Sequence, residues 1–161
     1  MIKKVNNSVY SVITTNKRAY YSYFIEKEFN AGLLLEGWEV KSLRVGQVNI
    51  SDSYITIRNS EAFLFGATFQ ALKETSSCVI CDNSRSRKLL LKKNEINELC
   101  ITIYQHGYSA IALSLFWQNA WAKLKVGVGR GKKQFDKRKS IKDQEWKIDK
   151  ARMMKNKQMI R

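Results

Sequence analysis

Long apolar runs and cysteines are scarce in this chain of 161 residues. No apolar stretch approaches the ~20 residues that a membrane-spanning helix needs, so the sequence argues against a membrane protein. Residues 1–8 contain no apolar signal core, and we expect no secretory signal. The 3 cysteines are few and odd in number, which is typical of a reducing compartment. We therefore expect a cytoplasmic protein.

Histidine is also scarce, because His106 is the only one in the chain. It lies in a predicted Gln-His-Gly turn, with no neighbouring serine and aspartate that would complete a catalytic triad. Cys78 and Cys81 have CxxC spacing, but a zinc site would need Cys100, which falls on the apolar face of a predicted helix. We expect no metal, no cofactor and no enzymatic activity. A thiol enzyme is the alternative, and it would require a thiolate of low pKa.

Negative charge is sparse, and positive charge is concentrated at the C-terminus. Residues 130–161 contain 13 Lys/Arg against 4 Asp/Glu, whereas the remaining 129 residues contain 16 against 10. The formal net charge of the whole chain is +15. A dense basic tail on a modestly basic domain is typical of a protein that binds phosphates. Nucleic acid is the favoured partner, ahead of an anionic membrane surface or an acidic protein.

The first 129 residues predict a mainly β domain. A long strand is expected over residues 23–35, bending at glycine. Alternating apolar residues predict a hairpin of strands 53–58 and 62–67, joined by Asn59 and Ser60, and a second over 111–128. Residues 70–87 are predicted to form a loop. We expect an antiparallel β-barrel of the oligonucleotide-binding type with short flanking helices; a split barrel or a sandwich is the alternative.

Helical spacing appears in three places. A short helix is predicted over 39–44, and a longer one from Leu89 to Ile103, or a shorter version capped by Asn94. Gly127, Gly129 and Gly131 are interpreted as a flexible hinge. Beyond them the pattern from Ser140 predicts a helix whose apolar stripe is thin, so we expect a tail that is disordered when free and helical when docked. The predicted division is a barrel domain, 1–130, and a basic tail, 131–161.

Basic residues also recur within the barrel domain, at 16–18, at 85–88 and on the outward face of the last strand. There Lys123 and Lys125 alternate with core residues beside Trp121. Cations interleaved with an aromatic ring on a sheet favour RNA binding. An ordinary solvated face is the alternative interpretation.

Colinear motifs run from about residue 11 to residue 158. They are Asn16 to Arg18, Tyr23 to Glu26, Ala31-Gly32, Gly37 to Arg44, Asn49 to Tyr54, Glu61 to Leu64, Arg85 to Leu91, Gly131 to Lys133 and Asp136 to Arg138. Taken together, this set resembles the SmpB family, the bacterial partners of transfer-messenger RNA.

The resemblance implies an oligonucleotide-binding-like barrel that binds the tRNA-like part of transfer-messenger RNA. It also implies delivery of this RNA to the A site of stalled ribosomes, where the tail enters the small-subunit decoding centre and the mRNA channel. The rescue reaction is trans-translation, which tags the stalled peptide. We expect a monomer. The alternative is a general single-strand nucleic-acid-binding or ribosomal protein on the same fold.

The resemblance also implies residue roles, which we write as expectations. RNA contacts fall to Asn16, Lys17, Arg18, Leu90 and Lys123, to which the sheet face adds Lys125. Decoding-centre contacts fall to Lys132, Lys133, Phe135, Asp136, Lys137 and Arg138, and the channel helix contains Trp146, Met153 and Met154. The sequence departs from the family pattern at Tyr20-Tyr21, Asn30 and Phe135, where Arg-His, an acidic residue and His are common.

Overall fold

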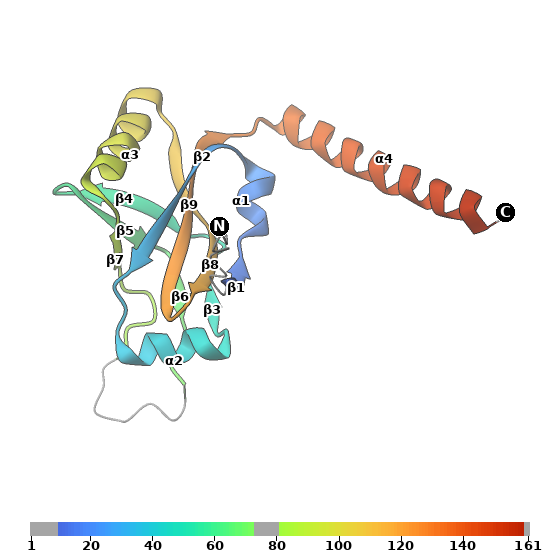
Figure 1. The fold of residues 1–161 in the computed structure, drawn as a ribbon. Helices are drawn as coiled ribbons and strands as arrows, with labels where there is room; N and C mark the ends of the chain where they lie inside the picture. The colour runs from blue at the N-terminus through green and yellow to red at the C-terminus, as the bar shows by residue number, and fades with distance from the viewer. Residues whose placement is uncertain (1–9, 73–80, 160–161) are drawn as a thin grey trace, which may run out of the picture.

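The computed structural model describes residues 10–72 and 81–159 (Figure 1). The strands are β1 Tyr10–Thr15, β2 Tyr23–Leu33, β3 Val48–Asn49, β4 Tyr54–Arg58, β5 Glu61–Phe65, β6 Thr68–Phe69, β7 Arg87–Leu90, β8 Ser109–Gln118 and β9 Trp121–Gly131. The helices are α1 Lys17–Ser22, α2 Gly37–Val45, α3 Lys93–His106 and α4 Gln134–Met159.

Six antiparallel strands close into a ring in the order β8-β4-β5-β7-β2-β9, and β9 pairs back with β8. Strand β1 pairs with the second half of β8, and the short strands β3 and β6 pair with each other. The core inside the ring includes Leu64, Phe69, Leu115, Leu124 and Val126, all buried. Figure 1 shows α2 across one end of the barrel and α4 extending away from it. The predicted oligonucleotide-binding-like barrel with flanking helices is confirmed.

Both hairpins are present at the predicted positions. Strands β4 and β5 pair from Tyr54–Phe65 to Arg58–Glu61, and the turn residues Asn59 and Ser60 have φ of 50° and 60°. Such left-handed pairs make the hairpin turn that matches strand twist. Strands β8 and β9 pair over almost their whole lengths. The long strand and the helix predicted over 39–44 are also confirmed, within β2 and α2.

The helix predicted from Leu89 is wrong in its first turn. Residues 87–90 form β7, which pairs with β5 and β2, and Leu89 is buried in the barrel. The seven-residue spacing from Leu89 to Ile96 is compatible with one face of a helix, but pairing of residues 87–90 with β2 and β5 makes this segment a strand. Helix α3 begins at Lys93, where the Glu95 carboxylate accepts a hydrogen bond from the Lys92 backbone N–H at 2.8 Å, so Asn94 is not its cap.

The glycine hinge is also a wrong interpretation, because Gly127, Gly129 and Gly131 belong to β9. At Gly129 a Cβ atom would lie 1.9 Å from the Phe24 carbonyl oxygen, so this glycine allows close approach of two strands. The β2–β9 register shifts at the same point, between Ile25 and Lys27. The last strand is therefore built into the barrel up to Gly131.

The tail forms the helix α4, which begins at Gln134 rather than at Ser140, and the expectation that the tail is disordered when free stays a prediction. Its 26 residues span about 39 Å at the usual helical rise. Helix α1 and the strands β3 and β6 were not predicted. Among the described residues, no helix combines the length and apolar character of a membrane span.

Candidate nucleic-acid interface

Three strands bring the predicted RNA-contact residues of the barrel together. Gly32 on β2 lies opposite Leu90 on β7 and opposite Lys123 on β9. A Cβ atom on Gly32 would lie 3.2 Å from the Leu90 Cβ, so the glycine leaves room for Leu90 to lean across β2. Leu90 is 54% exposed, and Lys123 is half-buried. We call Gly32, Leu90, Lys123, Lys125 and Trp121 the barrel patch.

Part of the positive charge of the barrel patch, that of Lys125, is neutralised by an acidic neighbour. Lys125 lies opposite Asn30, and its ammonium forms an ion pair with Glu28 at 3.0 Å. Trp121, at the start of β9, is 74% exposed, and it shares an outward face with Lys123 and Lys125. The patch thus combines an exposed ring, an exposed aliphatic side chain and ammonium groups, which can together contact bases and phosphates.

Asn16 is a structural centre rather than an RNA contact. Its side chain is 1% exposed. The amide nitrogen donates to the carbonyls of Ile50 and Ala112 at 3.0 Å and of Ser51 at 3.1 Å, while Oδ1 accepts from the Ala19 N–H at 3.0 Å. Asn16 therefore caps α1 and ties three segments together. The expected direct contact is corrected to a positioning role.

Asn16 fixes the two exposed cations that follow it. Lys17 and Arg18 open α1, and Ala19 buries the other face of this helix against Leu113 of β8. The Arg18 guanidinium forms an exposed ion pair with Asp52 at 2.7 Å. Such a pair contributes little to stability, but it orients the guanidinium at the surface.

The first residues of the tail are attached to α1. The Lys132 backbone N–H donates to the Ser22 carbonyl at 2.8 Å, and its ammonium donates to the Tyr20 carbonyl at 2.9 Å. The same ammonium lies 4.9 Å from the centre of the Phe24 ring. These contacts place Lys132 beside α1 before α4 begins.

The first turns of α4 contain the remaining predicted decoding-centre residues. The Lys137 ammonium lies 5.7 Å from the centre of the Tyr21 ring, and Phe135 is 76% exposed. Thus Tyr20 and Tyr21, which depart from the family pattern, contact the tail. Lys133 and Arg138 are exposed, and Asp136 is half-buried in the first turn. Farther along α4 the predicted channel residues are all exposed: Trp146, Met153 and Met154.

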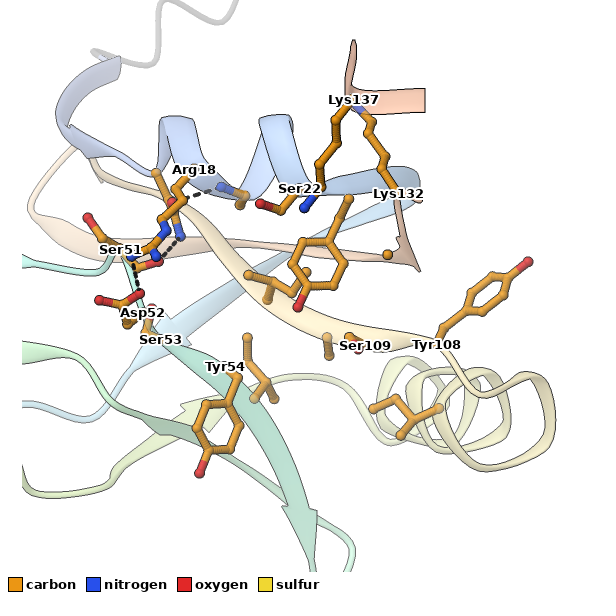
Figure 2. A pocket seen from close by; sticks show the side chains of 18 residues that line it. Arg18, Ser22, Ser51, Asp52, Ser53, Tyr54, Tyr108, Ser109, Lys132 and Lys137 are labelled. Carbon is orange, nitrogen blue, oxygen red and sulfur yellow. Dashed lines mark hydrogen bonds and ion pairs between the residues drawn. The ribbon is translucent and has the colours of Figure 1, made fainter. Parts of the chain in front are cut away.

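A groove of about 720 Å³ lies between α1, the tail and the ends of β4 and β8 (Figure 2). Cations from both predicted groups line it, namely Arg18 from α1 and Lys132 and Lys137 from the tail. Asp52 is the acidic residue among its described lining residues. The structure therefore brings part of the α1 motif together with part of the tail. We call this feature the tail-root groove.

The barrel patch and the tail-root groove lie far apart. On the β2–β9 ladder Gly32 pairs with Lys123, whereas Tyr23 pairs with Gly131. Nine residues of antiparallel strand span about 30 Å. The predicted site residues thus form two surfaces at opposite ends of one ladder, and the two can contact different partners at once.

The basic run at 85–88 is not part of either surface. Arg87 is fully buried, with its Nε 2.7 Å from Oε1 of the buried Glu39 and its guanidinium 3.9 Å from the centre of the Phe69 ring. Arg85 binds the other carboxylate oxygen of Glu39 at 2.6 Å, and Lys88 pairs with Glu61. The interpretation of this run as an RNA-binding cluster is therefore corrected.

Glu39 holds this buried network together. Burial raises the pKa of Glu39. Hydrogen bonds from Arg85 and from the Glu36 N–H, together with the charge of Arg87, lower it by more than burial raises it, so the pKa lies below the ordinary value of 4.5. The carboxylate is thus ionised at neutral pH. Arg87 also donates to the carbonyls of Ala67 and Asn83, which joins α2 to the segments around β6 and β7.

The residues considered for thiol or metal chemistry remain scattered. Cys78 lies outside the described residues, and Cys81 and Cys100 are half-buried and not joined in a disulfide. His106 is the exposed last residue of α3, next to Gly107, not part of a free turn. Within residues 10–72 and 81–159, no three His, Cys, Asp or Glu side chains gather as metal ligands.

Comparison with known proteins assigns the family. The sequence model of the SmpB protein family matches residues 13–156. This chain belongs to the SmpB family. The resemblance drawn from the motifs is thereby confirmed, and the match includes the barrel, the tail root and most of α4.

A solved SmpB structure supports the same assignment through its fold. It is described as "tmRNA-SmpB: a journey to the center of the bacterial ribosome". The two chains are 34% identical, with a TM-score of 0.62 over 75% of this chain and 85% of that chain. The sequence match and the structural match therefore assign the same family, and the sequence match includes the strands that carry the barrel patch.

Proposed function

We propose that this SmpB-family protein is an RNA-binding adaptor rather than an enzyme. It binds the tRNA-like part of transfer-messenger RNA and delivers it to the A site of stalled ribosomes for rescue and peptide tagging. It works in the cytoplasm as a monomer and needs no cofactor. The observation that supports this most is the pair of basic surfaces about 30 Å apart on the β2–β9 ladder. An adaptor between two RNA assemblies needs two such surfaces.

The barrel patch is the proposed site for the tRNA-like RNA. Leu90 offers an apolar contact and Lys123 a phosphate contact, and Lys125 adds charge beside them. Lys17 and Arg18, which lie on α1 at the opposite end of the ladder beside the tail-root groove, are proposed as a second contact with the RNA, and Asn16 positions them. Structured RNA is recognised largely through its shape, its backbone and its unpaired bases, and this mixture of groups suits all three.

The tail is the proposed ribosomal element. Lys132, Lys133, Phe135, Asp136, Lys137 and Arg138 contact the decoding centre, and α4 enters the empty mRNA channel with Trp146, Met153 and Met154. Because these apolar side chains are exposed on α4, they are available to a partner surface. In a helix of such polar composition, docking supplies the stability that self-packing does not.

A general single-strand nucleic-acid binder is the second candidate, favoured by the exposed Trp121 beside Lys123. Competition filter binding separates the two. We expect the tRNA-like RNA to outcompete an unstructured RNA of equal length at elevated salt, because shape-dependent contacts survive screening better than phosphate contacts. Equal competition by the two RNAs would support the general binder and contradict the adaptor.

The same assay tests the barrel patch. We expect Lys123→Ala to weaken binding of the tRNA-like RNA and to reduce the slope of log K against log salt by about one phosphate contact, roughly 0.7–0.9. Leu90→Ser should weaken binding without changing the slope, because it removes an apolar contact. Lys27→Ala is the matched control: this lysine pairs with Glu98 of α3. If Lys123→Ala keeps the wild-type slope, Lys123 is only a solvated strand residue.

We also propose that the barrel, residues 1–130, and the tail, 131–161, are separate units, and that the free tail is disordered. Truncation after Lys133 should preserve the cooperative thermal transition and binding of the tRNA-like RNA, because the core residues all precede Gly131. Circular dichroism of the full chain minus the truncated chain should show little helix. A difference equal to 26 helical residues contradicts the disorder, and a lost transition contradicts the boundary.

A further inference from the structure

The outward face of α3 exposes two bulky apolar side chains. Ile101 is 48% exposed and Tyr104 is 68% exposed, and the two lie one helical turn apart. The inward face of the same helix buries Leu99 and packs Ile103 against the barrel core. Because the outward face of a surface helix is normally charged or polar, an apolar pair at this position is accessible to a partner that can cover it.

Positive charge is absent from this part of the chain. Residues 94–122 contain no lysine or arginine, and no other run of the sequence lacks both for so long. Lys93, in the first turn of α3, lies roughly 16 Å along the helix from Tyr104, which is beyond the screening length of about 8 Å at physiological salt. In a chain of formal net charge +15, a face without cations is a poor site for phosphates. It favours a protein over RNA as the partner.

A small groove of about 250 Å³ lies along α3 where the helix faces β2. The described residues that line it come from α3, β2, β9 and the position before β8: Thr102, His106, Glu26, Lys27, Val128 and Tyr108. The Glu26 carboxylate accepts a hydrogen bond from the Tyr108 hydroxyl at 2.8 Å, and a carboxylate can accept further donors. Lys27 is paired with Glu98, and the C-terminal end of α3 adds partial negative charge. The groove therefore suits a cationic side chain.

We propose that the outward face of α3 and this groove, together the α3 surface, dock a protein partner. The partner binds through a segment that combines one bulky apolar side chain with one lysine or arginine. The apolar side chain packs on Ile101 and Tyr104, and the cation enters the groove and pairs with Glu26. The α3 surface is the same whichever RNA the protein binds, because these three residues belong to neither the barrel patch nor the tail-root groove.

The anchors stand on a helix that is already formed. The Glu95 carboxylate caps the first turn of α3, and Gly107, with φ of 64°, ends the helix with its N–H donating to the Thr102 carbonyl. Little backbone freedom is therefore lost when a partner docks. Tyrosine is also among the residue types that most often carry the energy of a protein interface, so Tyr104 is expected to be the main anchor.

Two occupants from this chain itself fit the α3 surface less well. The tail is directed towards α1 by the two hydrogen bonds of Lys132, and Figure 1 shows α4 leaving the barrel on the side away from α3. A second copy would approach against a net charge of +15 on each chain. A different protein needs only one cation in its docking segment and need not be basic as a whole, so it avoids this repulsion.

Photocrosslinking in living host cells identifies the occupant. A benzophenone side chain in place of Asn97, which is exposed one turn before Ile101, samples the α3 surface without removing either anchor. We expect mass spectrometry to find a crosslinked peptide of another protein that carries a lysine or arginine close to a bulky apolar residue. Benzophenone in place of Val45, which is 59% exposed at the end of α2, is the matched control and should not capture that peptide. Crosslinks only to RNA, to the tail or to a second copy, or no crosslink, overturn the proposal.

Binding of the captured peptide, made synthetically, to the purified full-length protein tests the contacts. Ile101→Ser and Tyr104→Ser should each weaken binding about tenfold or more, as truncation of a central interface anchor does. Glu26→Gln should weaken binding less and reduce its salt dependence, and it should have no effect on a peptide whose cation is replaced by a neutral residue. Val45→Ser is the control and should bind as wild type does.

Thermal unfolding and RNA binding separate docking from a structural role. Because Ile101 and Tyr104 are exposed and lie outside both RNA surfaces, the two anchor variants should keep the wild-type thermal transition and affinity for the tRNA-like RNA. If the anchor variants bind the peptide as wild type does, the proposal is overturned. It is also overturned if their affinity for the peptide falls only in parallel with the thermal transition or with RNA affinity.

Discussion

We expect the Asp136→Ala/Lys137→Ala/Arg138→Ala protein to bind the tRNA-like RNA almost as wild type does, yet to support almost no peptide tagging on stalled ribosomes. The three residues lie in the first turns of α4, about 30 Å along the β2–β9 ladder from the barrel patch. Each lost charged contact to RNA costs about 1–3 kcal/mol. Together the three should reduce tagging about a hundredfold or more.

The measurement pairs tagging in a reconstituted stalled-ribosome system with filter binding on the RNA alone. Lys92→Ala/Lys93→Ala/Glu98→Ala, at the N-cap and in the first turns of α3, removes the same charges from outside both surfaces and should leave both values unchanged. If the tail variant loses RNA affinity in proportion to tagging, the tail is only a phosphate clamp. The proposed contact with the decoding centre would then fail.

Substitutions at the other tail residues should likewise reduce peptide tagging while leaving affinity for the tRNA-like RNA nearly unchanged. Phe135→Ala should reduce tagging and Phe135→His should preserve it, because either ring can stack on a base. Trp146→Ala and Met153→Asp/Met154→Asp should lower tagging with little change in RNA affinity. Their side chains are exposed on α4, so the loss would come from contacts with the partner rather than from unfolding of the barrel.

The second large effect is on stability. Glu39→Ala should lower the free energy of unfolding by about 3–5 kcal/mol, because it leaves the buried guanidinium of Arg87 without its carboxylate. That is a large part of the ~5–15 kcal/mol that stabilises a typical domain. The matched control is Glu98→Ala, which removes an exposed ion pair with Lys27 and should cost about 0–1 kcal/mol.

Urea denaturation measures both variants, and pH gives an independent check. The folded-state pKa of Glu39 lies below its ordinary value of 4.5, so the carboxylate contributes its stability above that value and loses it as pH falls through the folded-state pKa. Wild type should therefore lose more stability than Glu39→Gln on acidification below about pH 4.5. If Glu39→Ala lowers the free energy of unfolding no more than Glu98→Ala does, the buried Glu39–Arg85–Arg87 network contributes little to stability.

The hairpins and the outward face of the last strand could be predicted from the sequence, because each depends on local alternation of apolar and polar residues. Alternation along 111–128 placed Lys123 and Lys125 on the outward face, and Asn59-Ser60 marked a turn that its positive φ values confirm. The strand at 87–90 could not be predicted in this way. Its four residues become a strand only through pairing with β5 and β2, which are distant in sequence.

The roles of individual polar residues were the least predictable part. Asn16, Arg85 and Arg87 belong to motifs that resemble RNA contacts, yet long-range contacts bury Asn16 and Arg87 and pair Arg85 with Glu39. Only the folded positions of Glu39 in α2 and Glu61 in β5 show that the positive charges of the run at 85–88 are paired. The tail-root groove was likewise not predicted, because α1, β4, β8 and the tail meet only in the folded chain.

The most direct measurement of the central claim is the identity of the RNA that copurifies with this protein from its host under native conditions. Sequencing of the bound fraction, normalised to total RNA, should show enrichment of one RNA whose ends fold into a tRNA-like structure. The Lys123→Ala protein should retain less of that RNA. A bound fraction made of many unrelated single-stranded RNAs, in proportion to their abundance, would contradict the adaptor and favour a general single-strand binder.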